Sequence, residues 1–194
     1  MMTLPNILTI FRILLTPVFI LCLFAEFDNA QFWALFIFIV ASITDAYDGY
    51  YARKNDMVTD TGKFLDPLAD KILVSSAFIS FAVMGLIDFW MVTLIIFRDL
   101  FVTGFRVIMS RKGFTMMTSQ IAKSKTSVQI GIIIFTLTIV SLKGINWSIV
   151  THYLTFVKEY ELVYYLTMVA VLFTLYTGFT YIQENRKAIK EMMN

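Results

Sequence analysis

Hydrophobic residues along this chain gather in long runs that short polar stretches separate. Six such runs occur, at 7–24, 32–47, 68–86, 89–109, 128–142 and 162–181. An α-helix needs about 20 mainly apolar residues to cross the hydrocarbon core of a bilayer. The pattern therefore predicts an all-α integral membrane protein, built as a bundle of about six transmembrane helices. No repeat or shift in composition divides residues 1–194, so we expect a single domain.

Composition strengthens the membrane assignment and argues against several other classes. Of the 194 residues, 58% are hydrophobic and only 15% are charged, whereas about a quarter of the residues in a soluble domain are charged. The net charge of +2 is too small to indicate a nucleic-acid partner. The single Cys22 cannot form an internal disulfide, and the single His152 has no cysteine or second histidine with which to bind zinc.

Positively charged residues favour alternate connections between the predicted helices. They are Arg53, Lys54 and Lys63 in the second connection, Arg111, Lys112, Lys123 and Lys125 in the fourth, and Arg186, Lys187 and Lys190 in the tail. Lysine and arginine are enriched in cytoplasmic loops, so we expect both termini to lie in the cytoplasm and the protein to sit in the inner (cytoplasmic) membrane. The aromatic residues of segment 143–161 suit a membrane–water interface.

Four aspartates stand where the second hydrophobic run ends and the third begins, namely Asp45, Asp48, Asp66 and Asp70. The first two are three residues apart and the last two are four apart, so each pair shares one face of a helix. We expect the helix of the second run to continue into this acidic motif. The next helix begins either at Pro67, with Asp66 as its N-cap, or near Thr61, with Pro67 inside it.

Four carboxylates brought together repel one another unless protons or cations neutralise them. Ligands that are all oxygen favour Mg²⁺, Mn²⁺ or Ca²⁺ over zinc, and a pair of metals suits phosphoryl transfer. Gly49 and Gly62 lack side chains, so a phosphate could approach the backbone there, and Arg53 could neutralise its oxygens. The alternative is that the aspartates are solvated helix ends beside a loop.

The motif DxxDGxxARx(8)GxxxDxxxD, from Asp45 to Asp70, resembles the signature of the CDP-alcohol phosphotransferases at every fixed position. These membrane enzymes displace CMP from a CDP-linked donor with an alcohol. The resemblance implies a helical bundle, often a homodimer, whose polar cavity faces the cytoplasm. It implies two Mg²⁺, or Mn²⁺ in their place, held by Asp45, Asp48, Asp66 and Asp70. It also implies that Asp70 takes the proton of the alcohol, and that the CDP moiety contacts Gly49, Ala52, Arg53 and Gly62.

Four further stretches resemble one branch of this family, the bacterial phosphatidylglycerophosphate synthases: PNILTIFR, DPLADK, FRDLFVTGFR and AKSKT. This resemblance implies CDP-diacylglycerol as the donor and glycerol 3-phosphate as the acceptor, both handled among membrane lipids. An acceptor that carries a phosphate needs a basic pocket. Arg98 and Arg106, about two turns apart on one helix face, could form it with Lys123 and Lys125. Alternatively, the arginines pair with Asp99 or reach the interface, and the lysines only anchor a loop.

Two further sets of polar residues lie within or beside the hydrophobic runs. Asn6, Thr9 and Arg12 recur every three residues, and this stripe could line the nucleotide cavity or be the polar start of an interfacial helix. Four cations lie within or at the edge of the runs, namely Arg12, Lys71, Arg98 and Arg106. A cation in hydrocarbon needs a counter-charge, so we expect an aspartate or a bound anion beside each.

Two other functions stay open at this point. The acceptor could instead be phosphatidylglycerol, as in a cardiolipin synthase of this family, or inositol phosphate, as in a phosphatidylinositol-phosphate synthase, or serine. Intramembrane charges could also belong to a cation transporter. Transporters, however, more often have charges near the midplane and internal repeats, whereas the acidic residues of this motif gather at one face and no repeat appears. Release of CMP without ion flux would separate an enzyme from a transporter.

Overall fold

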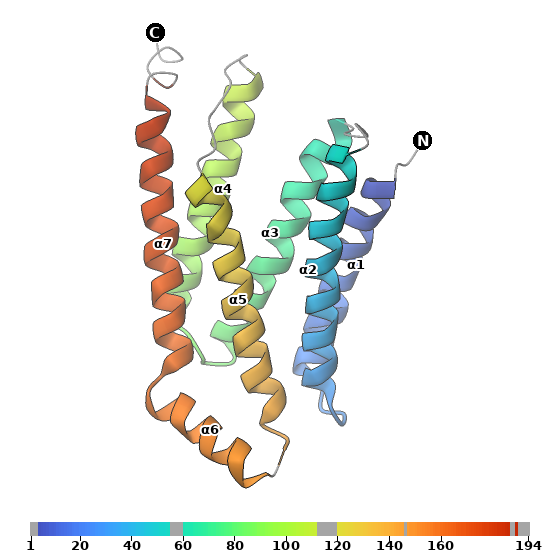
Figure 1. Ribbon diagram of the computed structural model, residues 1–194, viewed down its shortest axis with the longest axis vertical. Coiled ribbons are helices and arrows are strands. Elements are labelled where there is room, and N and C mark those ends of the chain that lie inside the picture. Colours follow the sequence, from blue (N-terminus) through green and yellow to red (C-terminus); the bar gives the residue numbers. More distant parts are fainter. Residues whose placement is uncertain (1–3, 55–59, 112–119, 146, 187–188, 190–194) are drawn as a thin grey trace.

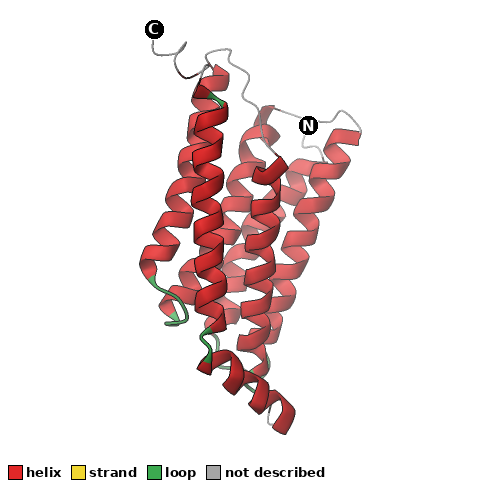
Figure 2. Ribbon diagram, turned by 60° about the vertical axis from the view of Figure 1, so that its left-hand side comes forward, coloured by secondary structure: helices red, strands yellow, loops and turns green. Residues whose placement is uncertain are grey.

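The computed structural model of the chain describes residues 4–54, 60–111, 120–145, 147–186 and 189, with side chains at 8–45, 69–109, 124–145, 147–186 and 189. Helices make up nearly all of these ranges (Figures 1 and 2). They are α1 (Leu4–Phe24), α2 (Ala30–Lys54), α3 (Asp60–Val83), α4 (Phe89–Arg111), α5 (Gln120–Leu142), α6 (Ser148–Glu159) and α7 (Leu162–Glu184). No strand occurs in the described ranges, which confirms the all-α prediction.

The long helices run side by side, and the shorter α6 lies across one end of the bundle (Figure 1). Helix α1 packs on α2 and α3, and α7 packs on α4 and α5. Helix α5 joins the two groups because it also contacts α2 and α3. The last turn of α2, the first turns of α3 and α5 and the last turn of α4 lie toward the same end of the bundle as the first turn of α1 and the last turn of α7 (Figure 1). The helix ends that flank the connections expected to be basic are therefore grouped at one end.

Several helices are apolar enough for a membrane environment. Among the described residues, Ser124–Leu142 and Leu162–Glu184 could cross a bilayer by length and composition, and Leu8–Phe24 and Ala30–Asp45 are shorter apolar helices. Large apolar side chains also cover the outside of the bundle, as at Leu21 and Phe179, whose side chains are 71% and 68% exposed. Surface of this kind is suited to hydrocarbon rather than water.

The two helices of the acidic motif extend well beyond the hydrophobic runs. Helix α2 continues to Lys54, as expected. Helix α3 begins at Asp60, which favours the start near Thr61; the alternative that Asp66 is an N-cap is wrong. Pro67 therefore lies inside α3. A membrane helix tolerates proline because neighbouring helices, polar side chains and water can satisfy the carbonyl group that proline leaves unbonded.

A tight turn at Gly85 sets α4 beside α3. The Leu86 N–H donates to the Phe81 carbonyl at 2.9 Å, and the Gly85 N–H donates to the Ala82 carbonyl at 3.0 Å. This pair of bonds is the Schellman arrangement that ends a helix. Gly85 has a φ of +70°, which glycine adopts without the steric cost of a Cβ atom. The short hairpin keeps the polar residues of α3 and α4 within reach of one another.

Helices α1 and α2 form the most extensively packed pair of the bundle. The rings of Phe19 and Phe38 meet with centroids 5.6 Å apart. Ala34 and Ala41 are fully buried on the same face of α2 as Phe38. Small residues let helix backbones approach closely, and this drives packing where lipid replaces water. The pair therefore gives a firm support for the polar residues at its upper end.

Helix α6 occupies part of the segment expected at a membrane–water interface. Val157 faces the bundle and is buried. An exposed stripe of large side chains recurs every three or four residues, at Ile149, Tyr153, Phe156 and Tyr160. A separate exposed set of the helix is polar, at Thr151, His152, Thr155 and Glu159. An apolar and a polar surface on one exposed helix are typical of a helix that lies in the plane of the interface.

This arrangement predicts that Trp147, next to α6 and 71% exposed, lies at the lipid surface. We would replace Trp33 and Trp90 with phenylalanine and reconstitute the protein in vesicles of brominated lipid. Bromine near the carbonyl end of the acyl chains should quench Trp147 fluorescence more than bromine near the methyl end, because interfacial helices enter the bilayer by only about 5–10 Å. Quenching by aqueous acrylamide alone would contradict the prediction.

The matched control places the single tryptophan on α7. Leu172 is near the middle of this helix and is 60% exposed. In a Leu172→Trp variant without the three natural tryptophans, bromine near the methyl end should quench more strongly. The order of the two lipids should therefore reverse between the two proteins.

Candidate functional site

A buried arginine holds the first aspartate of the acidic motif. Arg12 of α1 is fully buried, and its guanidinium forms an ion pair with the Asp45 carboxylate of α2, whose side chain is about one-third exposed. Thr9, one turn earlier in α1, is also fully buried. The two described residues of the polar stripe, Thr9 and Arg12, thus face the interior of the bundle. The expectation that an aspartate balances Arg12 is confirmed.

The last aspartate of the motif belongs to a second set of charges. The Lys71 ammonium lies 3.3 Å from the Asp70 carboxylate and 3.7 Å from the Asp99 carboxylate. Asp70 and Lys71 are on α3, whereas Asp99 is on α4. Lys71 therefore links the residue expected to act as the base with a carboxylate of the neighbouring helix. The expectation of a partner for Lys71 is also confirmed.

Asp99 is the centre of this second set. Its side chain is only 4% exposed, and it contacts cations from three helices. Besides Lys71, the Arg98 Nη1 atom lies 3.2 Å away, and the Lys125 ammonium donates a hydrogen bond to Asp99 Oδ1. Lys125 is 2% exposed, so it is not a loop anchor at the membrane surface. Unpaired charges buried this deeply would each cost several kcal/mol, and the mutual pairing offsets that cost.

Helix α7 contacts the Arg98 side chain at Thr177 and Gly178. The Arg98 Nη2 atom donates to the Thr177 hydroxyl at 2.9 Å, and Thr177 in turn donates to the Thr174 carbonyl. A Cβ atom built at Gly178 would lie 3.1 Å from Arg98 Cγ and 3.3 Å from Arg98 Nε. The Arg98 side chain therefore runs across α7 at a point where a Cβ atom would be a tight contact. The side-chain amide of Gln129, on α5, donates to the Thr174 hydroxyl at 3.4 Å.

Arg106 lies further along α4 and has a different environment. Its side chain is exposed, and its guanidinium carbon is 5.7 Å from the centre of the Tyr181 ring of α7. This distance is within the range of a cation–π contact. Arg98 and Arg106 thus both reach α7, as their spacing on one face of α4 predicts. Only Arg98 joins the buried cluster around Asp99.

The remaining candidate residues lie outside the described side chains. Their backbone is helical in α1 for Asn6, in α2 for Asp48, Gly49, Ala52 and Arg53, in α3 for Gly62 and Asp66, and in α5 for Lys123. Within the described side chains no group of three or more histidine, cysteine, aspartate or glutamate residues is close enough to hold a metal ion. The four-aspartate metal site and the nucleotide contacts therefore stay predictions.

The two described carboxylates of the motif fit a divalent cation by their chemistry. Asp45 and Asp70 offer oxygen donors only, and both are partly exposed. Each already has one cation beside it, Arg12 and Lys71 respectively. Oxygen ligands of this type favour Mg²⁺ or Mn²⁺ over zinc. The donor set is therefore the one expected for the predicted metals.

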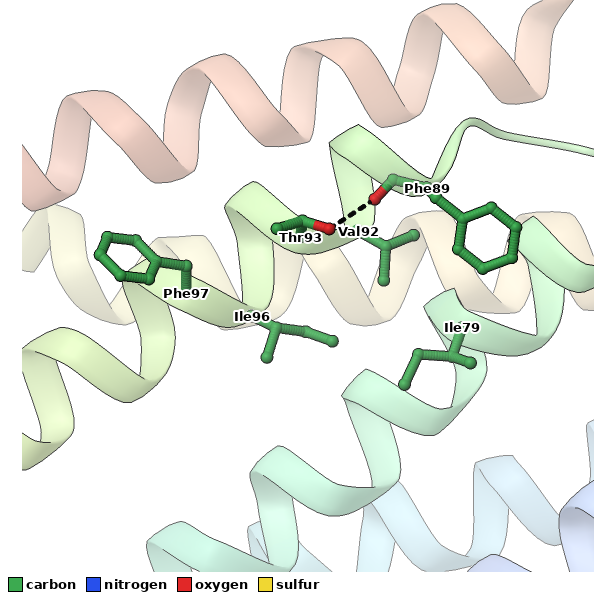
Figure 3. Close-up of a pocket in the computed structure, with 6 residues that line it drawn as sticks. All are labelled: Ile79, Phe89, Val92, Thr93, Ile96 and Phe97. Carbon is green, nitrogen blue, oxygen red and sulfur yellow. Dashed lines mark hydrogen bonds between the residues drawn. The ribbon is translucent and has the colours of Figure 1, made fainter.

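An apolar groove lies between α3 and α4, away from these charges. It is lined by Ile79, Phe89, Val92, Thr93, Ile96 and Phe97 and has a volume of about 310 Å³ (Figure 3). The Thr93 hydroxyl donates to the Phe89 carbonyl at 2.9 Å, so it offers no free donor. Ile79 is nine residues beyond Asp70, about 13 Å along the helix. The groove suits hydrocarbon and cannot recognise a nucleotide.

Sequence reasoning missed how the polar cluster is organised. Asp99 entered only as a possible partner of Arg98, although a carboxylate inside a hydrophobic run is itself a signal of function. Lys71 was expected to need a partner but was given no place in the site. Thr177 and Gly178 carry no such signal, because small residues are common in membrane helices. Their role follows from the path of the Arg98 side chain alone.

Comparison with known proteins identifies the class to which this architecture belongs. The family model of the CDP-alcohol phosphatidyltransferases matches residues 2–176. The chain therefore belongs to this family, as the acidic motif predicted, and it is an enzyme of the CDP-alcohol phosphotransferase type. The match covers both the acidic motif and the cluster around Asp99.

Individual relatives are similar over most of the chain. The chain is 36% identical to the CDP-diacylglycerol–glycerol-3-phosphate 3-phosphatidyltransferase of Bacillus subtilis (strain 168), over 98% of both chains. It is 36% identical to the protein of the same name in Rickettsia bellii, over 95% of this chain and 96% of the relative. It is 42% identical to a probable phosphatidylglycerophosphate synthase of Mycobacterium tuberculosis (strain H37Rv), over 65% of this chain and 61% of the relative.

The close approach of Arg98 to Gly178 gives a prediction about stability. In Gly178→Ala the new Cβ atom forces Arg98 to move, which strains its bonds to Thr177 and Asp99. Overpacking of this kind costs about 1–3 kcal/mol. We expect a lower midpoint of thermal unfolding in detergent for the purified variant.

Gly131→Ala is the matched control. Gly131 is also inside a helix, α5, and a Cβ atom there meets nothing within 4 Å. Alanine is the better helix former by about 1 kcal/mol, so this variant should be as stable as the wild type or more stable. Equal loss of stability in both variants would show that the Arg98 contact is not the cause.

Proposed function

We propose that this protein transfers the phosphatidyl group of CDP-diacylglycerol to sn-glycerol 3-phosphate, forming phosphatidylglycerophosphate and CMP in glycerophospholipid biosynthesis. The observation that carries the proposal is the chain of contacts from Asp70 through Lys71 and Asp99 to Arg98 and Lys125. It puts a basic cluster close to the candidate base, as an acceptor with both a hydroxyl and a phosphate requires. The names of the similar proteins support the same donor and acceptor.

The chemical step uses Asp70 as the base. Asp70 takes the proton of the acceptor's primary hydroxyl, and the freed oxygen attacks the β-phosphorus of the donor. The bond between that phosphorus and the bridging oxygen breaks, and CMP leaves with the electron pair. A carboxylate can serve in this way only within hydrogen-bond reach of the hydroxyl. The partial exposure of Asp70 is compatible with such access.

Two divalent cations, Mg²⁺ or Mn²⁺, would be held by Asp45, Asp48, Asp66 and Asp70, and they would supply charge neutralisation of the diphosphate. The ion pair with Arg12 of α1 orients the Asp45 carboxylate from the interior of the bundle, because the Arg12 guanidinium is fully buried. Gly49, Ala52, Arg53 and Gly62 would contact the CDP moiety. Asn6 and Thr9 would line the same cavity from α1, on the helix that carries Arg12.

The acceptor's phosphate would be bound by Arg98, Arg106, Lys123 and Lys125. Arg98 and Lys125 are the two described members of this set that share a buried carboxylate. An arginine fork and a lysine ammonium offer several donors each, so both keep N–H groups beyond those given to Asp99. An acceptor without a phosphate, such as serine, would leave these remaining N–H groups without the partner proposed for them, which favours a phosphorylated acceptor.

The membrane organises the remaining parts of the substrate and of the chain. The donor's acyl chains would stay in the bilayer, and the apolar groove of α3 and α4 suits one of them. The chain would span the membrane six times, with both termini and the acidic motif at the cytoplasmic side of the inner membrane. The common location of the polar helix ends supports this orientation (Figure 1). A homodimer is the expected assembly, as in other members of the family.

The first test measures CMP release by purified protein with CDP-diacylglycerol and Mg²⁺. Glycerol 3-phosphate, inositol phosphate, serine and phosphatidylglycerol are compared as acceptors in parallel. We expect release only with glycerol 3-phosphate, and we expect a chelator to abolish it and added Mg²⁺ to restore it. Release of CMP with a different acceptor alone would support the reaction of the family but show that glycerol 3-phosphate is not the acceptor. Ion flux in vesicles without CMP release would favour a transporter instead.

The role of Asp70 gives a second prediction. In Asp70→Asn the side chain keeps nearly the same size but loses its charge and its basicity. General-base catalysis contributes about 10²- to 10⁴-fold, so kcat should fall at least by that factor in folded protein. Asp28→Asn, at an exposed position in the connection from α1 to α2, is the control and should keep wild-type turnover. Near-normal turnover of Asp70→Asn would exclude Asp70 as the base.

A further inference from the structure

We infer that Asp99 is the positioning residue of the acceptor site, a buried carboxylate that sets Arg98 and Lys125 in the arrangement that receives a phosphate. This inference rests on the proposed function. Asp99 itself does not contact the acceptor, because a carboxylate and a phosphate repel each other. It acts through the cations that it holds.

The first argument is the geometry of the cluster. Asp99 Oδ1 is shared by Arg98 Nη1, at 3.2 Å, and the Lys125 ammonium, while Asp99 Oδ2 faces Lys71 at 3.7 Å. These three cations come from α4, α5 and α3, and Arg98 continues to Thr177 of α7. One carboxylate thus sets the positions of polar groups from four helices. The other cations proposed for this pocket, Arg106 and Lys123, have no described contact with it.

The second argument is flexibility. Lysine and arginine side chains have many rotamers and lose entropy when they are ordered, and like charges move apart when nothing holds them. Without Asp99, Lys71, Arg98 and Lys125 would repel one another around a buried centre. Pairing with Asp99 removes that freedom before the acceptor arrives, so the acceptor does not have to order these side chains itself. Preorganisation of this kind raises affinity.

The third argument is the balance of charge. The three cations face two described carboxylates, Asp99 and Asp70, and Asp70 has a separate role at the reacting hydroxyl. Positive charge is therefore left over on the side of Arg98 and Lys125. A phosphate monoester carries between one and two negative charges near neutral pH. A bound phosphate would balance this excess among the described side chains.

This argument makes a prediction whose sign is informative. If Asp99 merely reduced the positive potential, Asp99→Asn would bind an anionic acceptor more tightly. If Asp99 positions the cations, the same variant binds the acceptor more weakly although it is more positive. We expect the KM for glycerol 3-phosphate to rise about 10- to 100-fold, because the acceptor must then order the Arg98 and Lys125 side chains itself. The KM for CDP-diacylglycerol should change by less than about twofold, because that substrate binds elsewhere.

The experiment compares Asp99→Asn and Asp99→Glu with the wild type and with Asp88→Asn. Asp88 is exposed, comes just before the start of α4 and accepts a hydrogen bond from the Trp90 indole N–H. Its variant should therefore behave as wild type. Asp99→Glu keeps the charge but moves it by one methylene, and it should recover part of the lost acceptor affinity. The midpoint of thermal unfolding is also recorded with increasing inorganic phosphate. We expect phosphate to stabilise the wild type and Asp88→Asn, but not Asp99→Asn.

Each result bears on the inference. An unchanged or lowered acceptor KM in folded Asp99→Asn would overturn it, and so would an undiminished stabilisation by phosphate. If Asp99→Asn does not fold, Asp99→Glu decides, and an acceptor KM equal to that of the wild type would overturn the inference. A wild type that phosphate stabilises through Asp99, but that releases no CMP with glycerol 3-phosphate, would overturn the proposed function and support the anion site.

Discussion

The rest of the structure depends on one buried carboxylate. Asp99 is 4% exposed in a bundle whose outside is hydrocarbon-like, and an isolated charge in such a place is not tolerated. The three cations that neutralise it come from three helices, so their pairing fixes how α3, α4 and α5 lie against one another. Helix α7 closes the cluster through Thr177 and the space left by Gly178. Packing and electrostatics thus impose the same arrangement.

The two halves of the bundle hold different parts of the proposed site. Helices α1 and α2 form a close-packed support in which the fully buried Arg12 carries Asp45. Helices α4, α5 and α7 hold the basic residues, and α3 contributes Asp70 and Lys71 between the two halves. A reaction that joins a nucleotide-linked lipid to a phosphorylated alcohol needs acidic and basic regions close together but separate. The central position of α3 meets that need.

The hydrophobic runs predicted the helices well but are shorter than them, and the differences have one cause. The acidic motif itself indicated the continuation of α2 and, as one alternative, the start of α3 near Thr61. Hydrophobic runs marked α2 to 47, α3 from 68 and α5 from 128, whereas the helices reach Lys54, Asp60 and Gln120. All three extensions lie at the end that carries the polar site. Hydropathy reports only the length of helix that faces lipid, so it stops where a helix enters a polar cavity. Arg12, Lys71 and Arg98 were correctly expected to have aspartate partners, whereas the described contact of Arg106 is with the Tyr181 ring. The sharing of Asp99 depends on three-dimensional packing that spacing cannot give.

The grouping of the polar helix ends at one end of the bundle has a consequence for membrane growth. On the proposed function, the water-soluble acceptor enters and CMP leaves on the same side, and the lipid's polar headgroup never crosses the hydrocarbon. The new phospholipid is therefore delivered to the leaflet that supplied the donor. Enzymes of this architecture enlarge one leaflet only, so a cell that uses them needs a separate route that carries lipid across the bilayer.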